Sequence, residues 1–180
     1  MKIIILLFIY LSSQADVKSD MFDYYQNEKY EKVCNIGHRI LDLNAKDEEF
    51  VSLYAFGCLK SDYIDRLTIP ISLLKYTKEA RSNSAYFAVI LMQKKLLYHS
   101  LVDGYELSTL KLPTTDYALS KVFDLYSKLG KHESRTLYIF EDESNPKITY
   151  KLYLESNNKL KKMVIEEFYD TIATHRHVYW

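Results

Sequence analysis

The amino-acid sequence predicts an α+β fold, in which α-helical hairpins are followed by a small C-terminal antiparallel β-sheet. Apolar residues recur every three or four positions as far as Leu129, and they alternate with polar residues beyond Arg135. Only 4 Gly and 3 Pro occur among 180 residues, so few residues interrupt the helices. We therefore expect a signal peptide (1–15), a helical domain (16–130) and a sheet region packed on the helices (131–180).

The N-terminal segment has the features of a secretory signal peptide. Lys2 supplies a positive start, Ile3–Leu11 is a run of nine apolar residues, and Ser13–Ala15 fits a small-x-small cleavage site. Nine helical residues span about 14 Å, roughly half the hydrocarbon thickness of a bilayer. We expect cleavage after Ala15 and a periplasmic or secreted product with no stable membrane span. An uncleaved anchor or a buried strand is the alternative.

Four later segments have helical periodicity. Their apolar faces run from Tyr30 to Leu41, from Phe50 to Cys58, from Tyr86 to Leu101 and from Leu119 to Leu129. Pro70 interrupts the chain between the second and third segments, so a helix either begins near this proline or kinks there. The expected N-caps are Asp62, Ser84 and either Thr115 or Asp116, and Gly130 is expected to close the last helix.

The first two segments resemble tetratricopeptide repeats. Tyr30–Val33 and His38–Asn44 match the second helix of that repeat and its exit, and Asp23–Asn27 matches the end of the first helix. One repeat period of 34 residues later, Tyr54–Leu59 stands where the next first helix belongs. The resemblance covers residues 16–76 best, and a third unit after Ser82 matches less well.

The resemblance implies stacked hairpins with a concave face that binds peptides or partner proteins. Glu28 and Asp62 stand where the repeat usually has a turn glycine, and Ala45 stands where it usually has a closing proline. Generic helical hairpins are therefore the alternative. Tyrosines on the first helices suit a binding surface, because they offer a large contact area at a low entropy cost. The expected partner-binding residues are Tyr24, Tyr25, Tyr54 and Tyr86.

The alignment with the repeat places Cys34 and Cys58 on neighbouring helices. An even pair of cysteines in an oxidising compartment predicts one disulfide, and two buried free thiols are the alternative. Cys34 also shares a helix face with His38, so a zinc site with Cys58 or a Cys–His nucleophile was a weaker hypothesis. No fourth zinc ligand is evident, and a regular helix is the wrong context for a catalytic dyad.

The last fifty residues contain the strand pattern. Thr136–Phe140 and Ile148–Leu154 predict two strands, Ser156–Lys159 predicts a tight turn, and His175–Trp180 predicts a final strand. Met163–Asp170 fits either a strand or a helix. His175 and His177 would face the same side of a strand, but two imidazoles alone do not make a metal site.

Composition and motifs exclude several functional classes. The formal net charge of zero argues against a nucleic-acid binder, and the four glycines are too widely spaced for a phosphate-binding loop. No hydrolase or zinc-protease motif occurs, so we expect no enzyme activity, cofactor or metal. We expect an exported, non-enzymatic adaptor that binds a partner protein or peptide in the cell envelope. The alternative is a periplasmic small-molecule-binding protein with an apolar pocket between helices and sheet. The oligomeric state stays open.

Overall fold

The structure, a computed structural model, describes residues 17–157 and 160–180, so the predicted signal peptide lies outside the described residues. The chain forms two compact units, the first ending at Ala85 and the second running from Tyr86 to Trp180. The first is helical and the second contains the sheet, which confirms the predicted α+β class. The units divide within α5 (Lys78–Asp103), whereas the sequence suggested residue 130, because the later part of α5 and α6 (Ala118–Ser127) pack with the strands.

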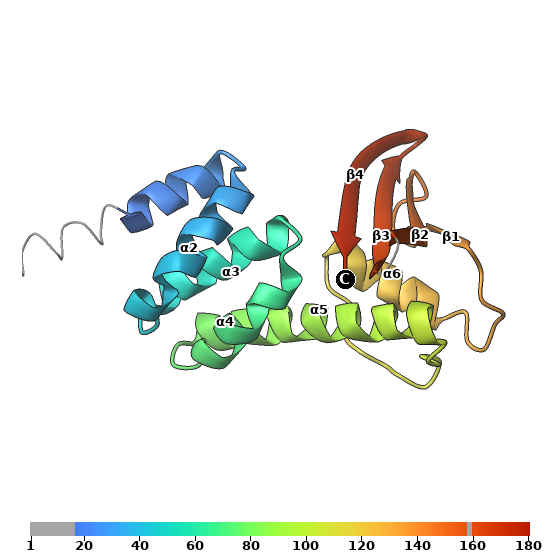
Figure 1. Ribbon diagram of the computed structural model, residues 1–180, viewed down its shortest axis with the longest axis horizontal. Helices are drawn as coiled ribbons and strands as arrows, with labels where there is room; N and C mark the ends of the chain where they lie inside the picture. The colour runs from blue at the N-terminus through green and yellow to red at the C-terminus, as the bar shows by residue number, and fades with distance from the viewer. Residues whose placement is uncertain (1–16, 158–159) are drawn as a thin grey trace, which may run out of the picture. The chain divides into compact units, whose positions relative to one another are not determined.

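The N-terminal unit is a series of helices joined by short turns (Figure 1). Residues 17–26 are helical, and α2 (Tyr30–Asn44) and α3 (Glu48–Lys60) follow. The start of α3 is fixed by Asp47, whose carboxylate accepts hydrogen bonds from the amides of the second and third helical residues at 3.1 and 3.0 Å. The first two segments with helical periodicity are therefore confirmed as helices.

The same kind of turn ends two helices of this unit, at positions one 34-residue period apart. Glu28 and Asp62 both adopt a left-handed backbone, with φ of 58° and 65°. In each turn an amide donates to the carbonyl oxygen five positions earlier at 2.9 Å, from Lys29 to Tyr24 and from Tyr63 to Cys58. This bond is characteristic of the Schellman motif that ends helices. Asp62 therefore ends a helix, and its predicted role as an N-cap is wrong.

Pro70 lies in a short helix and not at a kink in a long one. Ile64–Leu67 form a 3-10 turn (η1), and α4 (Thr68–Leu73) carries the buried Pro70 in its first turn, where a missing amide hydrogen costs nothing. α5 begins at Lys78, so the predicted N-cap at Ser84 is wrong. The hydroxyl of Ser84 donates to the carbonyl oxygen of Ile71 at 2.7 Å.

Glu48, in the first turn of α3, holds the connection between α4 and α5. Its carboxylate accepts hydrogen bonds from three successive backbone amides, those of Lys75, Tyr76 and Thr77, at 2.7, 2.7 and 2.9 Å. These bonds, chiefly that from Tyr76, lower the pKa of Glu48 to about 2, because they favour the ionised carboxylate. At neutral pH the charged side chain therefore ties this connection to α3.

α2 and α3 approach each other closely at two glycines. A Cβ atom at Gly37 would lie 2.5 Å from Cδ2 of Tyr54, and one at Gly57 would lie 2.7 Å from Cγ1 of Val33. Tyr54 is 1% exposed and Val33 is 0% exposed, so neither side chain has room to move aside. The two helices therefore need glycine at both contacts to keep this separation.

Replacing Gly37 with alanine should destabilise the N-terminal unit by about 1–3 kcal/mol, because the added methyl group overpacks the contact with Tyr54. Alanine is the better helix former by about 1 kcal/mol, which opposes this loss of stability. A net destabilisation therefore requires the steric strain to exceed the gain in helix propensity. Urea denaturation of the purified protein measures the change. His38→Ala is the matched control at an exposed neighbouring position, with an expected change below about 0.5 kcal/mol. An unchanged or raised midpoint for Gly37→Ala would contradict the close packing.

The C-terminal unit contains an antiparallel sheet whose strands pair in sequence order. The strands are β1 (Leu137–Glu141), β2 (Ile148–Asn157), β3 (Leu160–Tyr169) and β4 (Ile172–Tyr179). The segment that fitted either a strand or a helix belongs to β3, which pairs with β2 along its whole length and with β4 from Met163 to Tyr169. A register shift between Glu167 and Phe168 marks a β-bulge in the pairing with β4.

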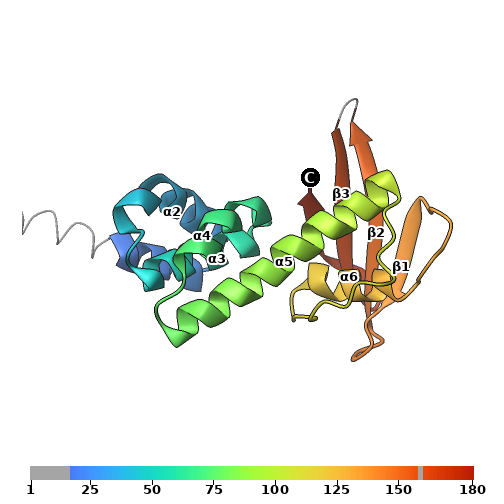
Figure 2. The ribbon, with the colours of Figure 1, turned by 90° about the horizontal axis from the view of Figure 1, so that it is seen from below.

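Helices cover one face of this sheet. α6 and the part of α5 that belongs to this unit lie across the strands (Figure 2). In β1, buried Tyr138 and Phe140 alternate with exposed Leu137 and Ile139, as expected for a strand with one face on the core. Tyr117 occupies the N-cap of α6 without a side-chain cap, so neither predicted residue, Thr115 or Asp116, fills that position.

Asp142 organises the turn between β1 and β2. Its side chain is nearly buried, and it accepts four hydrogen bonds: from the Lys121 ammonium, the Tyr150 hydroxyl and two turn amides, at 2.9–3.1 Å. Burial alone would raise its pKa, but the bonds from Lys121, Tyr150 and Ser144 outweigh burial and hold the pKa of Asp142 well below its usual value. The carboxylate is therefore a charged anchor that joins α6, the turn and β2.

Candidate functional site

A groove of about 530 Å³ lies on the N-terminal unit between the helical residues 17–26 and α3. Lys18, Ser19 and Phe22 line it from the first helix, and Glu49 and Leu53 line it from α3. Phe22 lies four positions after Lys18 and three after Ser19, and Leu53 lies four positions after Glu49, so the lining residues of each helix share one face. Phe22 is 52% exposed, which is unusual for a large apolar side chain. The groove therefore offers an apolar floor that the described residues leave uncovered.

Charged side chains stand at one end of this groove. The Lys18 ammonium lies 2.8 Å from carboxylate oxygens of both Asp47 and Glu49. Burial alone would lower the pKa of Lys18, but its hydrogen bonds with Asp47 and Glu49 outweigh burial and raise that pKa. Burial alone would raise the pKa of Asp47, but hydrogen bonds, including the one from Lys18, outweigh burial and lower it. One cation faces two anions, so this end of the groove keeps an excess of negative charge at neutral pH.

The structure places the predicted tyrosines outside this groove. Tyr54 is 1% exposed and packs on Gly37, so its prediction as a partner-binding residue is corrected: the ring belongs to the core. Tyr24 is half-buried, with the Lys32 ammonium 4.3 Å from its ring centroid. Tyr25 is half-buried against Tyr30, with ring centroids 5.1 Å apart. Burial is the main reason that the pKa of Tyr25 is raised, and the electrostatic interaction with Tyr30 adds to it.

Tyr86, the fourth predicted residue, belongs to the C-terminal unit. Its hydroxyl donates to a carboxylate oxygen of Asp116 at 2.8 Å, and its ring makes an edge-to-face contact with Phe87. None of the four predicted tyrosines is among the residues that line the groove. The sequence-based argument did not select Phe22 or Leu53, although they lie four positions after Lys18 and Glu49 on the two helices.

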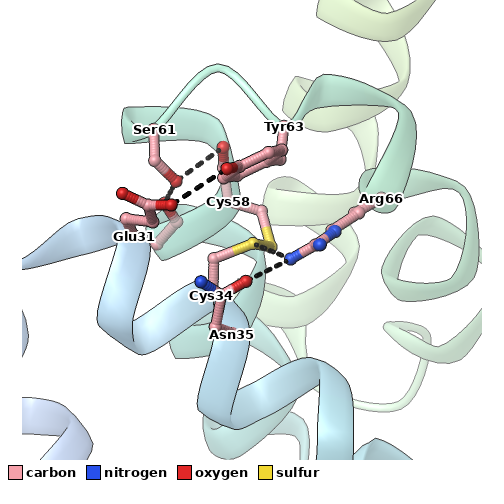
Figure 3. The surroundings of a disulfide bond; sticks show 8 residues. Glu31, Cys34, Asn35, Cys58, Ser61, Tyr63 and Arg66 are labelled. Atoms are coloured by element: carbon pink, nitrogen blue, oxygen red, sulfur yellow. Dashed lines mark hydrogen bonds between the residues drawn. A yellow bond between two sulfur atoms is a disulfide. The ribbon is translucent and has the colours of Figure 1, made fainter.

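The predicted disulfide between Cys34 and Cys58 is confirmed, and it joins α2 to α3 (Figure 3). Both cysteines are fully buried. The Arg66 guanidinium donates to the sulfur of Cys34 at 3.2 Å and to the side-chain oxygen of Asn35 at 2.9 Å, so it covers the bridge from η1. With both sulfurs in the bridge, neither cysteine can be a thiolate nucleophile or a zinc ligand with His38.

The two C-terminal histidines both face Glu167. The nearer nitrogens of His177 and His175 lie 2.8 and 4.0 Å from the same carboxylate oxygen. The hydrogen bond with His177 is the main reason that the pKa of Glu167 is lowered. Over residues 17–157 and 160–180, no group of three or more His, Cys, Asp or Glu side chains is arranged to hold a metal ion. These histidines therefore act as a strand-to-strand contact between β3 and β4.

Comparisons with known proteins returned no match. No protein-family model matches the chain, and neither the curated proteins nor the solved structures include a significant match. None of the described helices combines the length and the apolar character needed to cross a membrane.

Proposed function

We propose that the protein is an exported, non-enzymatic adaptor that binds a segment of a partner protein in the groove between residues 17–26 and α3. The observation that carries this proposal is the exposed Phe22, which forms an apolar floor together with Leu53. Exposed aromatic side chains in a concave site are the usual anchors of protein interfaces. A second helix from the partner, or an extended segment, would cover this floor.

The spacing of the turns supports a tetratricopeptide-like origin for this groove. Two helices end in the same left-handed turn one repeat period apart, at Glu28 and Asp62. In the alignment with that repeat, the residues before each turn form the first helices, and these helices line the concave face that binds peptides. Residues 17–26 and α3 are the elements on which the groove lies.

The charges at the end of the groove favour a particular partner chemistry. Asp47 and Glu49 share the single ammonium of Lys18, and the side chain of Glu49 is 86% exposed. A basic residue on the partner would therefore find an accessible carboxylate beside the apolar floor. We expect the bound segment to carry a large apolar side chain with Lys or Arg within one helical turn of it.

The proposed location is the periplasm or the outside of the cell, after removal of a signal peptide at residues 1–15. A disulfide that joins two helices is compatible with this location, because disulfides persist in oxidising compartments. In the cell envelope a small adaptor of this kind would link its bound partner to another component through its remaining surface.

A photo-crosslinking side chain placed at position 22 in the producing cell tests this function. The expected result is a covalent adduct with one partner, and mass spectrometry should map the adduct to an apolar segment that contains a basic residue. Leu43, which is 64% exposed on α2 and outside the groove, is the matched control position and should give little adduct. Equal yields at positions 22 and 43, or no adduct at 22, would contradict the proposal.

A further inference from the structure

A cavity of about 360 Å³ opens in the C-terminal unit where α5 and α6 end. Its lining comes from the last turn of α5, the end of α6, the two following loops and Tyr138 of β1. Gly104 and Gly130 line it with positive φ values of 73° and 64°, and no atom lies within 4 Å of where a Cβ would stand. The volume lies in the range of small-ligand sites, about 300–1,000 Å³.

Three aromatic rings from different segments form one wall of this cavity. Tyr126, His132 and Tyr138 contact each other edge to face, with ring centroids 5.1, 5.2 and 5.5 Å apart. Tyr126 is 6% exposed and Tyr138 is 2% exposed, so the wall is fixed by the core behind it. Little of either tyrosine ring is exposed, so this wall shapes the cavity, and the lining ring that is open to a ligand is that of Tyr105, which is 44% exposed.

Hydrogen bonds fix the orientation of each ring. Nδ1 of His132 lies 2.8 Å from the Gly130 carbonyl oxygen, which can only accept, so this nitrogen carries a proton. In the neutral imidazole, Nε2 then accepts from the Tyr138 hydroxyl at 3.1 Å, and the Tyr138 oxygen accepts from the Arg135 amide at 3.1 Å. Ser100 donates to the Tyr126 hydroxyl at 3.1 Å. The wall is therefore organised before any ligand arrives.

The charges and hydroxyls around the cavity define the ligand that would fit. The lining contains one acidic side chain, Glu106, and one basic side chain, Lys131. Ser100, Ser108 and Ser127 also line the cavity, and their hydroxyls donate to Tyr126, Glu106 and the Asp124 carbonyl oxygen, so toward a ligand these oxygens can accept hydrogen bonds. Tyr105 stands among them, 44% exposed and stacked on His99 with ring centroids 4.8 Å apart.

We propose that this cavity binds a small neutral sugar with a pyranose ring. Such a sugar has an apolar face of C–H groups that can lie on a tyrosine ring, and its hydroxyls both donate and accept hydrogen bonds. One acidic and one basic side chain in the lining offer a charged ligand no net attraction that would offset the cost of taking its charge out of water. The mixed aromatic and hydroxyl lining differs from the apolar pocket expected from the sequence. This activity goes beyond partner binding, since its site lies wholly in the C-terminal unit.

An NMR titration of the whole ¹⁵N-labelled protein with sugars of matched ring and different charge tests the proposal. Glucose and N-acetylglucosamine are the neutral probes, glucosamine is the cationic probe and glucuronate is the anionic probe. We expect saturable shifts of the amides of Ser100, Tyr126 and His132 with a neutral probe, and at least about tenfold weaker binding of both charged probes. Absence of saturable binding by both neutral probes, or preference for a charged one, would overturn the proposal.

Variants at two exposed tyrosines locate the binding. Tyr105→Ala should weaken binding of the neutral sugar about tenfold, because it removes an aromatic surface at the cavity. Tyr76→Ala is the matched control, since Tyr76 is 74% exposed and lies outside the cavity lining. Equal affinities for the two variants would show that the sugar binds elsewhere, which also overturns the proposal. The groove is untouched by either change, so this test is separate from that of the adaptor function.

Discussion

Replacing Asp142 with alanine should lower the free energy of unfolding of the C-terminal unit by about 3 kcal/mol. The change removes the acceptor of four hydrogen bonds and leaves the Tyr150 hydroxyl buried without this partner. Thermal or urea denaturation measures the loss. Asp124→Ala is the matched control, because Asp124 makes a more exposed ion pair with Lys128 that should contribute less than about 1 kcal/mol. Similar losses for the two variants would contradict the role of Asp142 as a buried anchor.

The same carboxylate makes stability depend on pH. The folded-state pKa of Asp142 lies below its ordinary value, so its contribution is complete above the ordinary pKa of Asp and is lost as the pH falls toward the folded-state value. The wild-type protein should therefore lose stability between about pH 5 and pH 2 more steeply than Asp142→Asn. Parallel pH profiles for the two proteins would show that another group dominates the acid sensitivity.

Removing the disulfide with Cys34→Ala and Cys58→Ala together should destabilise the N-terminal unit by about 3 kcal/mol, because the unfolded chain regains the freedom of the closed loop. The midpoint of urea denaturation should fall accordingly. A reducing agent should lower the midpoint of the wild-type protein toward that of the double variant and leave the variant unchanged. Equal midpoints of the oxidised wild type and the double variant would contradict a stabilising bridge.

The sequence was sufficient to predict the helices of the N-terminal unit and the disulfide between them. Apolar periodicity located α2 and α3, and the 34-residue period placed Glu28 and Asp62 at the two turns, where the backbone is left-handed. The N-caps were less predictable. Asp62 has the propensity of an N-cap but lies in a Schellman turn that ends a helix. Ser84 has the same propensity but lies inside α5, which begins six residues earlier, at Lys78.

Side-chain burial was the main source of error in the candidate site. Tyr54 was expected on the binding face because it stands on a first helix, but the absence of a side chain at Gly37 lets α2 cover its ring. Phe22 lies four positions after Lys18, but nothing in the sequence shows that this face of the first helix stays uncovered. The cavity of the C-terminal unit could not be predicted at all, since its residues come from two helices, two loops and a strand that only the fold brings together.

The most direct measurement of the central claim is the affinity of the crosslinked partner segment, made as a synthetic peptide, for the whole protein and for Phe22→Ala. We expect the peptide to shift the NMR signals of Lys18, Phe22 and Leu53, and to bind Phe22→Ala at least about tenfold more weakly than the wild type, while Leu43→Ala binds as the wild type does. Unchanged affinity for Phe22→Ala, or shifts confined to residues outside the groove, would contradict partner binding at this site.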